Sequence, residues 1–356
     1  MSDDYQLVPL ANGEKTLFSA RYGEKMHPGL GPSAEAEVLY VRQLGIRERL
    51  PARRGPFVVW DVGLGAAANA LALLRATREV PGELHLVSFD NTSEPLEFAL
   101  KHAAELGYPA GYETELTELL RARSVEFAQG NLKVRWKFIL GDFPKLLAAG
   151  TLGCAGTDGS SPGGEIPPID SRIEPRNRAG ETPAPLPVHG QGVELSGEGQ
   201  LVRGGAEPGG KRPPAAPGRM PDATAVPPPD AIFYDAFSPA KNPAMWTLPV
   251  FADLFRALDP ARPCALTTYT RSTMIRATLL LAGFYVGVGH ATGLKEETTM
   301  AANAAGLIAE PLDARWLARA RRSDSAEPLR EAAYARKPLR PGTAETLAGH
   351  AQFRRA

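Results

Sequence analysis

The sequence predicts an α/β protein built on a doubly wound, Rossmann-like sheet that ends in an antiparallel hairpin. Two observations lead to this fold class. Short apolar runs alternate along the chain with amphipathic segments of roughly 10 to 15 residues. A glycine-rich turn joins the first apolar run directly to the first helix-forming segment. Both features are typical of parallel strands that are joined by crossover helices.

The first half of the expected sheet contains three strands and two helices. Residues 57–61 (Phe-Val-Val-Trp-Asp) form an apolar run with the length of a buried strand. Residues 69–77 are rich in helix formers and follow the glycine turn, so we expect the first crossover helix there. The next elements along the chain are a strand at 84–89, a helix at 94–106, and a strand at 134–140 that ends before Gly141 and Asp142.

The second half repeats the alternation after a long interruption. Residues 231–235 (Ala-Ile-Phe-Tyr-Asp) and 264–269 are apolar runs that suit buried strands. A helix is expected after each of them, near 249–258 and at 272–282. Residues 284–288 and 306–308 are then expected to pair as the closing antiparallel hairpin.

The interruption has a composition unlike the rest of the chain. Residues 151–229 contain 15 glycines and 15 prolines among 79 residues, and no Phe, Tyr or Trp. Such a segment cannot bury enough apolar surface to offset the entropy lost on ordering, so it is predicted to be a disordered insertion. A proline-rich ligand for a partner is the alternative. The predicted single domain then comprises residues 1–150 and 230–308, followed by a basic C-terminal tail at 309–356.

Overall charge and cysteine content exclude several classes of protein. Lys and Arg together number 40, as do Asp and Glu, so bulk electrostatic attraction to nucleic acid is not expected. The two cysteines form no disulfide framework, and the six histidines show no ligand spacing, so no metal is predicted. The acidic start and the absence of a long apolar run argue against a signal peptide and a membrane span. A cytoplasmic location is therefore expected.

The turn after the first expected strand reads Asp-Val-Gly-Leu-Gly-Ala-Ala-Ala-Asn from Asp61 to Asn69. Gly63 and Gly65 would let the backbone approach a nucleotide closely. The same pattern occurs at dinucleotide sites and at S-adenosylmethionine sites, and a glycine turn that only lets a helix pack on a strand is a third interpretation.

Acidic residues at the strand ends distinguish the two cofactors. Asp90 follows the second strand, where a carboxylate can accept hydrogen bonds from both ribose hydroxyls of adenosine, although capping of the next helix stays open. Asp142 follows the third strand and is placed to accept from an adenine amine. Together with Asp61, these acids make an anionic rim that disfavours a pyrophosphate and suits a sulfonium and an ammonium group. S-adenosylmethionine, bound by Asp61, Gly63, Gly65, Asn69, Asp90 and Asp142, is therefore favoured over NAD.

The segment from Asp235 to Trp246 (Asp-Ala-Phe-Ser-Pro-Ala-Lys-Asn-Pro-Ala-Met-Trp) has the composition of a loop that closes over a flat substrate. With this segment in place, the chain resembles the MnmC methyltransferase family, enzymes of tRNA wobble-uridine modification. The residues that carry the resemblance are 60–71, 235–246, 268–270, 283–284 and 295–298, with 16–19, 21–24 and 35–37 near the N-terminus.

The resemblance implies methyl transfer from S-adenosylmethionine to the aminomethyl nitrogen on C5 of the tRNA wobble uridine. The FAD-dependent oxidase domain of bifunctional members is not expected, because 48 residues follow Ile308 and no second glycine fingerprint is present. A separate enzyme would then supply the aminomethyluridine.

Residue roles follow from the same resemblance. Asp235 is predicted to hold or receive the proton of the amine, with capping of its own loop as the alternative. Phe237 and Trp246 are candidates for stacking on a splayed-out base, although either can be a core residue. Asn242 is predicted to contact the substrate. Phosphate contacts are predicted for Lys241, Arg271 and Lys295, with a solvated surface as the alternative.

The expected tail carries 10 Lys or Arg against 6 Asp or Glu. Arg315, Arg319, Arg321 and Arg322 form one short helix-like run in which several share a face, so they are candidates for a tRNA contact, although a solvated tail is favoured. Two other functions stay open at this point. One is an S-adenosylmethionine enzyme acting on a small amine, which the neutral charge favours. The other is a noncatalytic nucleotide-binding module.

Overall fold

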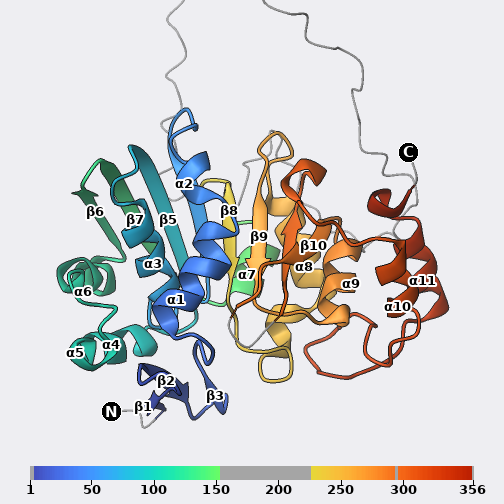
Figure 1. Ribbon diagram of the computed structural model, residues 1–356, viewed down its shortest axis with the longest axis horizontal. Coiled ribbons are helices and arrows are strands. Elements are labelled where there is room, and N and C mark those ends of the chain that lie inside the picture. Colours follow the sequence, from blue (N-terminus) through green and yellow to red (C-terminus); the bar gives the residue numbers. More distant parts are fainter. Residues whose placement is uncertain (1–3, 153–225, 293–295, 355–356) are drawn as a thin grey trace, which may run out of the picture. The chain divides into compact units, whose positions relative to one another are not determined.

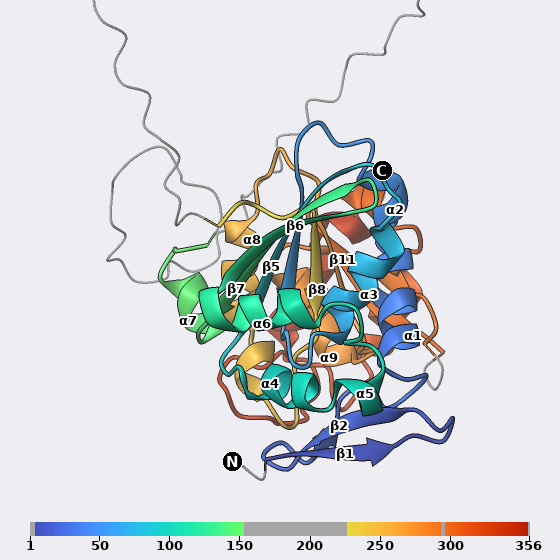
Figure 2. The ribbon, with the colours of Figure 1, turned by 90° about the vertical axis from the view of Figure 1, so that its left-hand side faces the viewer.

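The computed structural model describes residues 4–152, 226–292 and 296–354. They form one mixed eight-stranded sheet between two layers of helices, together with a small three-stranded sheet near the N-terminus (Figures 1 and 2). The order of the large sheet is β10-β11-β9-β8-β4-β5-β7-β6. Its strands are β4 (Phe57–Val62), β5 (Gly82–Asp90), β6 (Ser124–Gln129), β7 (Leu132–Leu140), β8 (Ala231–Tyr234), β9 (Ala265–Thr268), β10 (Tyr285–Gly289) and β11 (Thr298–Ala302).

The five central strands of the large sheet, from β9 to β7, run parallel, and both edges are antiparallel. The predicted doubly wound fold with a C-terminal antiparallel hairpin is therefore confirmed. One strand of that hairpin was predicted at the wrong place. It is β11 at Thr298–Ala302, whereas the expected segment 306–308 overlaps a short 3-10 helix, η3 (Ala305–Leu307).

Two threonines explain why the sequence pattern missed β11. Thr298 and Thr299 are both fully buried. Buried strands were predicted from runs of apolar residues, so these two threonines were passed over. The hydroxyl of Thr299 donates to the carbonyl of Thr270 at 2.6 Å, and the hydroxyl of Thr298 donates to the carbonyl of His290 at 2.9 Å. Buried hydroxyls that are satisfied in this way are compatible with a core strand, but no hydropathy pattern reveals them.

The helices divide between the two faces of the sheet (Figure 2). Along β4, Phe57 and Val59 pack into one core, and Val58, Trp60 and Val62 pack into the other. This alternation follows from the two-residue period of a strand. The first face carries α1 (Pro32–Ala36), η1 (Glu37–Arg42), α2 (Ile46–Arg49), α3 (Ala68–Thr77), α4 (Glu94–Lys101), α5 (Ala103–Leu106) and α6 (Glu113–Ala122). The second carries α7 (Phe143–Ala148), α8 (Leu248–Ala257), α9 (Thr273–Leu281), α10 (Ala314–Ala320) and α11 (Pro341–Ala348).

The segment after Ile308 is not the solvated tail that the sequence predicted. Trp316 and Leu317 of α10 and Leu347 of α11 are buried in the core of the second face. Gln352 also joins the sheet, because its side chain accepts from the amide of Val286 at 2.7 Å and donates to the carbonyl of the same residue at 2.8 Å. The four arginines of the predicted run are exposed, while the face of α10 that carries Trp316 and Leu317 packs against the domain.

The predicted insertion lies almost entirely outside the described residues. Its two described ends, Leu152 and Val226, pair with each other in a parallel bridge. A few residues later, the buried carboxylate of Asp230 accepts from the amide of Val58 at 2.8 Å and from Nε of Arg262 at 2.8 Å. These contacts hold the start of β8 beside the start of β4, so both ends of the segment lie toward the amino edge of the parallel strands.

Candidate active site

Strand register brings four acidic or glycine-containing strand ends onto one edge of the sheet. Val62 of β4 pairs with Tyr234 of β8 on one side and with Phe89 of β5 on the other. Asp90 of β5 in turn pairs with Leu140 of β7. The residues that follow these strands border a cavity of about 410 Å³, within the roughly 300–1,000 Å³ typical of small-molecule sites. The cavity lies where the chain order reverses between β4 and β8, the usual ligand site of such sheets.

The turn between β4 and α3 requires glycine at its first position. Gly63 has a φ of 94°, and a Cβ on it would lie 2.7 Å from the carbonyl oxygen of Asp235. A side chain there would push the loop after β8 away from the loop after β4. Gly65, with a φ of 51°, completes the turn. Gly63 and Gly65 both line the cavity, as predicted for a cofactor loop.

Amide groups of this turn are already used within the protein. The amides of Gly63 and Leu64 both donate to the carbonyl of Phe89, at 2.9 and 3.0 Å. The amide of Gly65 donates to Oδ2 of Asp90 at 2.9 Å. A pyrophosphate site would need such amides to point at the ligand. Their internal use, beside carboxylates, fits S-adenosylmethionine and disfavours a dinucleotide.

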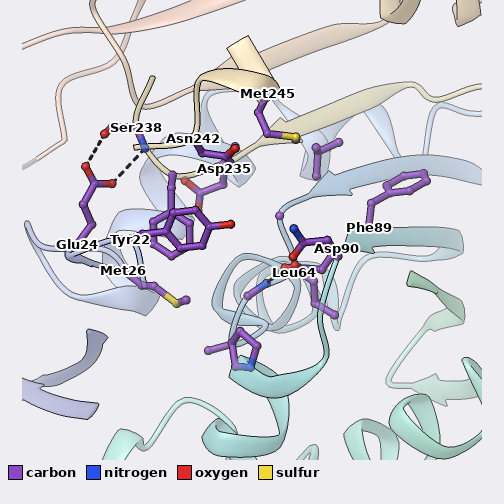
Figure 3. A pocket seen from close by; sticks show the side chains of 18 of the residues that line it. Tyr22, Glu24, Met26, Leu64, Phe89, Asp90, Asp235, Ser238, Asn242 and Met245 are labelled. Atoms are coloured by element: carbon purple, nitrogen blue, oxygen red, sulfur yellow. Dashed lines mark hydrogen bonds between the residues drawn. The ribbon is translucent and has the colours of Figure 1, made fainter. Parts of the chain in front are cut away.

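Asp90 and Asp142 line the cavity but differ in their surroundings. Burial raises the pKa of Asp90 above its ordinary value, and hydrogen bonds from the amides of Gly65 and Thr92 oppose the shift. Figure 3 shows Asp90 beside Leu64 and Phe89, on the opposite side of the cavity from Tyr22 and Glu24. Asp142 is partly exposed and caps α7, accepting from the amide of Lys145 at 3.1 Å. Asp90 is thus the better held of the two predicted cofactor acids.

Asp61 was predicted to bind the cofactor, but its side chain does not border the cavity. It lies in β4, just before the glycine turn. It is completely buried, and the hydroxyl of Ser88 donates to its Oδ2 at 2.8 Å. Desolvation raises the pKa of Asp61 to about 8, and the charges of Asp235 and Asp90 add to the rise. The hydrogen bond from Ser88 lowers the pKa but only partly offsets these effects. The nearby Trp136 donates to Ser88, so the acid belongs to a buried network. Any influence of Asp61 on a cofactor is therefore indirect.

The raised pKa of Asp61 predicts a specific pH dependence of stability. Between its ordinary pKa of 3.8 and about 8, the folded chain keeps a proton that the unfolded chain releases. The free energy of unfolding should therefore fall as the pH rises through this range. Asp61→Asn, which stays neutral, should show a smaller fall between pH 5 and pH 8. Urea unfolding of both proteins at the two pH values measures the difference, and equal falls would contradict the assignment.

Asp235 is the first residue of the loop after β8, and its side chain contacts the start of α3. Nδ2 of Asn69 donates to its Oδ2 at 2.7 Å, and Nε2 of His27 lies 3.7 Å from the same oxygen. The side chain of Asp235 is 17% exposed and borders the cavity. Asn69 is buried and does not border the cavity, so the structure corrects its predicted contact with the cofactor: Asn69 orients Asp235.

The N-terminal segment supplies a cavity wall that the sequence analysis did not assign. It begins with the three-stranded sheet of β1 (Tyr5–Pro9), β2 (Lys15–Ser19) and β3 (Glu24–Lys25). The carboxylate of Glu24 accepts from the amide of Ser238 at 3.1 Å and also from its hydroxyl, as Figure 3 shows. This contact ties the N-terminal sheet to the loop after β8. Tyr22, Met26 and His27 also line the cavity.

Among the predicted substrate contacts, the structure corrects Trp246. It is 0% exposed, and its Nε1 donates to the carbonyl of Phe237 at 2.8 Å. Trp246, the last residue of η2 (Pro243–Trp246), therefore holds the loop through this hydrogen bond. Because it is completely buried, it cannot stack on a base. Phe237 and Asn242 do line the cavity. Lys241 is exposed, and its Nζ would lie 3.5 Å from a Cβ on Gly23.

Two further predicted contacts have other positions. Lys295 lies outside the described residues. Arg271 is exposed just after β9 and does not border the cavity. Among the described residues, no group of three or more His, Cys, Asp or Glu side chains could hold a metal ion. In the same part of the chain, no helix is long and apolar enough to cross a membrane.

Comparisons with known proteins agree with this geometry. A family model for an S-adenosyl-L-methionine-dependent methyltransferase matches residues 223–304. The tRNA 5-methylaminomethyl-2-thiouridine biosynthesis bifunctional protein MnmC of Pseudomonas fluorescens (strain Pf0-1) is 43% identical over 65 residues, 17% of this chain and 10% of the relative. MnmC of Nitrosospira multiformis is 46% identical over 65 residues, with the same coverage. The chain is related to the MnmC methyltransferases.

A solved structure extends the relationship to the fold of the whole chain. The crystal structure of MNMC2 from Aquifex aeolicus superimposes with a TM-score of 0.56 and 20% identity, covering 98% of this chain and 85% of that one. The sequence matches to the MnmC relatives themselves span only about a tenth of their length. This MnmC-related chain is an S-adenosyl-L-methionine-dependent methyltransferase. S-adenosyl-L-methionine is its cofactor, in agreement with the prediction from the acidic rim.

Proposed function

We propose that this methyltransferase methylates the aminomethyl nitrogen on C5 of the wobble uridine in tRNA. The observation that carries the proposal is the position of Asp235, which borders the cavity beside Gly63 on a loop of the MnmC type. The curated relatives that match this chain are proteins of 5-methylaminomethyl-2-thiouridine biosynthesis. A tRNA substrate also agrees with the predicted cytoplasmic location.

Carboxylates near Asp235 favour a cationic acceptor. Glu24 and Glu35 line the same cavity, and Glu35 is 5% exposed. The electrostatic influence of Asp235, Glu24 and Glu35 converges on Tyr269, whose pKa burial and these charges raise well above its ordinary value. A primary aminomethyl group is an ammonium at neutral pH, so this end of the cavity would attract it.

Two aromatic rings at the cavity offer a surface for a pyrimidine. Tyr22 and Phe237 are stacked, with ring centroids 4.1 Å apart and an interplanar angle of 19°. A base could therefore stack on an outer face of the pair but not between the rings. Arg21, Lys25 and Lys241 are exposed around this pair, and we propose that they contact the tRNA phosphates.

The residues that would hold the cofactor are Gly63, Gly65, Asp90 and Asp142. The carboxylate of Asp90 suits the ribose hydroxyls, and that of Asp142 suits the adenine amine. S-adenosyl-L-methionine supplies an electrophilic methyl group. The protein has to position the amine and accept the proton that leaves it, because only a neutral amine is a nucleophile. We assign proton acceptance to Asp235. The loop of Phe237 and Asn242 would hold the uridine in line with the methyl group.

The substrate assay compares tRNA that carries 5-aminomethyluridine with the same tRNA carrying an unmodified wobble uridine. We expect methyl transfer from radiolabelled S-adenosyl-L-methionine to the first tRNA only. Transfer to small primary amines, with none to aminomethylated tRNA, would favour the alternative of a small-molecule N-methyltransferase. Cofactor binding without transfer to either would favour a noncatalytic module. A separate enzyme that supplies the aminomethyluridine is part of the proposal.

Removal of residues 153–225 should leave the reaction intact. The described ends of this segment, Leu152 and Val226, pair toward the amino edge of the sheet, and the cavity lies at the carboxyl edge. A variant in which a short Gly/Ser linker replaces the segment should keep the wild-type methyl-transfer rate to within about threefold, because loop closure depends only weakly on length. If the shortened protein folds, by circular dichroism and thermal unfolding, but is inactive, the segment has a role in the reaction.

A further inference from the structure

His27 has an unusual backbone conformation for its residue type. Its φ is 50°, in the left-handed region, and among the described residues only Ala67 and Arg123 share a positive φ without being glycine. Side chains are held in this region mainly where the surrounding structure demands it, often at functional sites. The segment just after β3 thereby presents His27 to the cavity, where its side chain is 13% exposed.

Asn69 and His27 approach the same oxygen of Asp235. Asn69 lies 2.7 Å from Oδ2, and Nε2 of His27 lies 3.7 Å from it. The amide of Asn69 can orient the carboxylate but cannot take a proton from it. An imidazole can accept a proton near neutral pH. Of these two side chains, only His27 can therefore pass a proton onward from Asp235.

The other titratable groups that face Asp235 and His27 are two phenols and two hydrogen-bonded carboxylates. Burial and the charge of Asp235 raise the pKa of Tyr40 well above its ordinary value, and burial does the same for Tyr269, so both phenols keep their protons. Glu24 is hydrogen-bonded to Ser238. Glu35 accepts from the amide of Gly29 at 3.4 Å. Further titratable groups nearby are Tyr22 and Asp90, which line the cavity, and the buried Asp61, whose pKa the charges of Asp235 and Asp90 help to raise.

We propose that His27 is the positioning residue that takes over the amine's proton from Asp235. The inference rests on the proposed function, since it requires an amine acceptor. The ammonium group loses one proton to Asp235, which passes it to Nε2 of His27. The neutral nitrogen then forms a bond to the methyl carbon while the bond from that carbon to sulfur breaks, leaving its electron pair on sulfur. The product leaves as a secondary ammonium, and His27 releases its proton to the solvent at the cavity.

His27→Asn is the most informative variant, because asparagine tolerates the left-handed conformation and keeps a hydrogen-bond donor but cannot titrate. Single-turnover methyl transfer to aminomethylated tRNA is measured from pH 5.5 to 9. We expect a loss of about tenfold at pH 7 with unchanged cofactor affinity. In acid, log rate should fall less steeply with decreasing pH in the variant than in the wild type, because the variant lacks an imidazole that has to be neutral to accept the proton.

A second variant separates proton transfer from a structural role. His27→Ala should regain part of its rate when imidazole is added, and the rescue should grow with pH as more imidazole becomes neutral. His102→Asn, on the surface after α4 and outside the cavity, is the matched control and should behave as the wild type.

The outcomes distinguish the two proposals. Wild type that is inactive on aminomethylated tRNA overturns the proposed function and this inference with it. An active wild type together with an unchanged pH slope in His27→Asn, or with no rescue of His27→Ala, overturns the role of His27 alone.

Discussion

Asp235→Asn should lower the rate of methyl transfer about a hundredfold or more, while the affinity for S-adenosyl-L-methionine stays within about twofold. The amide has nearly the shape of the carboxylate and can still accept the hydrogen bond from Asn69, so the loop after β8 should keep its conformation. It cannot accept the proton of the amine. The loss should therefore lie in the chemical step and show in single-turnover rates on aminomethylated tRNA.

The pH dependence of this variant gives an independent check. At higher pH a larger share of the substrate amine is already neutral, so Asp235→Asn should recover part of the lost rate. Asp253→Asn, on α8 outside the cavity, serves as the matched control because it makes the same chemical change in a carboxylate that pairs with Arg256. A wild-type single-turnover rate in Asp235→Asn would mean that Asp235 only shapes its loop.

Asp90→Ala should weaken binding of S-adenosyl-L-methionine about tenfold to a hundredfold. The substitution removes the carboxylate that would accept from the ribose hydroxyls, and leaving such donors unpaired costs about 1.5–3 kcal/mol. It also removes the acceptor for the amide of Gly65, which holds the glycine turn in place. Isothermal titration calorimetry measures the change, after thermal unfolding has shown that the variant is folded.

Asp142→Ala is the natural comparison for Asp90→Ala. Asp142 lines the same cavity but has a side chain that is 47% exposed and already caps α7. Its removal should weaken cofactor binding less than the removal of Asp90. Unchanged affinity in Asp90→Ala, or a larger loss in Asp142→Ala, would contradict the assignment of the ribose to Asp90.

Several features of the site could be predicted because they depend on local sequence. The glycine turn from Gly63 to Gly65 and the acid Asp235 follow directly after buried strands, and Asp90 is the last residue of another. In a parallel sheet the carboxyl ends of neighbouring strands share one edge, so such residues converge whatever the rest of the chain does. The cofactor class followed from the excess of carboxylates at that edge.

Other features could not be predicted, because partners distant in the sequence decide them. Trp246 has the composition of a stacking residue, but contacts with Tyr234, Phe251 and Tyr269 bury it completely. The helix after Asp313 carries a run of arginines that suggests a solvated tail, yet its Trp316 packs into the core. In short elements such as η2 and α10, the neighbouring side chains that pack against each residue decide whether that residue is buried or exposed.

The sequence by itself determined the parallel sheet, the glycine turn and the acidic edge, because strand periodicity and the residues directly after each strand set them. Only the tertiary structure decided how the cavity is closed. The contact between Glu24 and Ser238 joins residues 214 positions apart, and it brings Tyr22 and His27 to the loop of Asp235. A polar segment that contains only short strands carries no periodic signal of its own, so its position depends on these long-range hydrogen bonds and not on any local pattern.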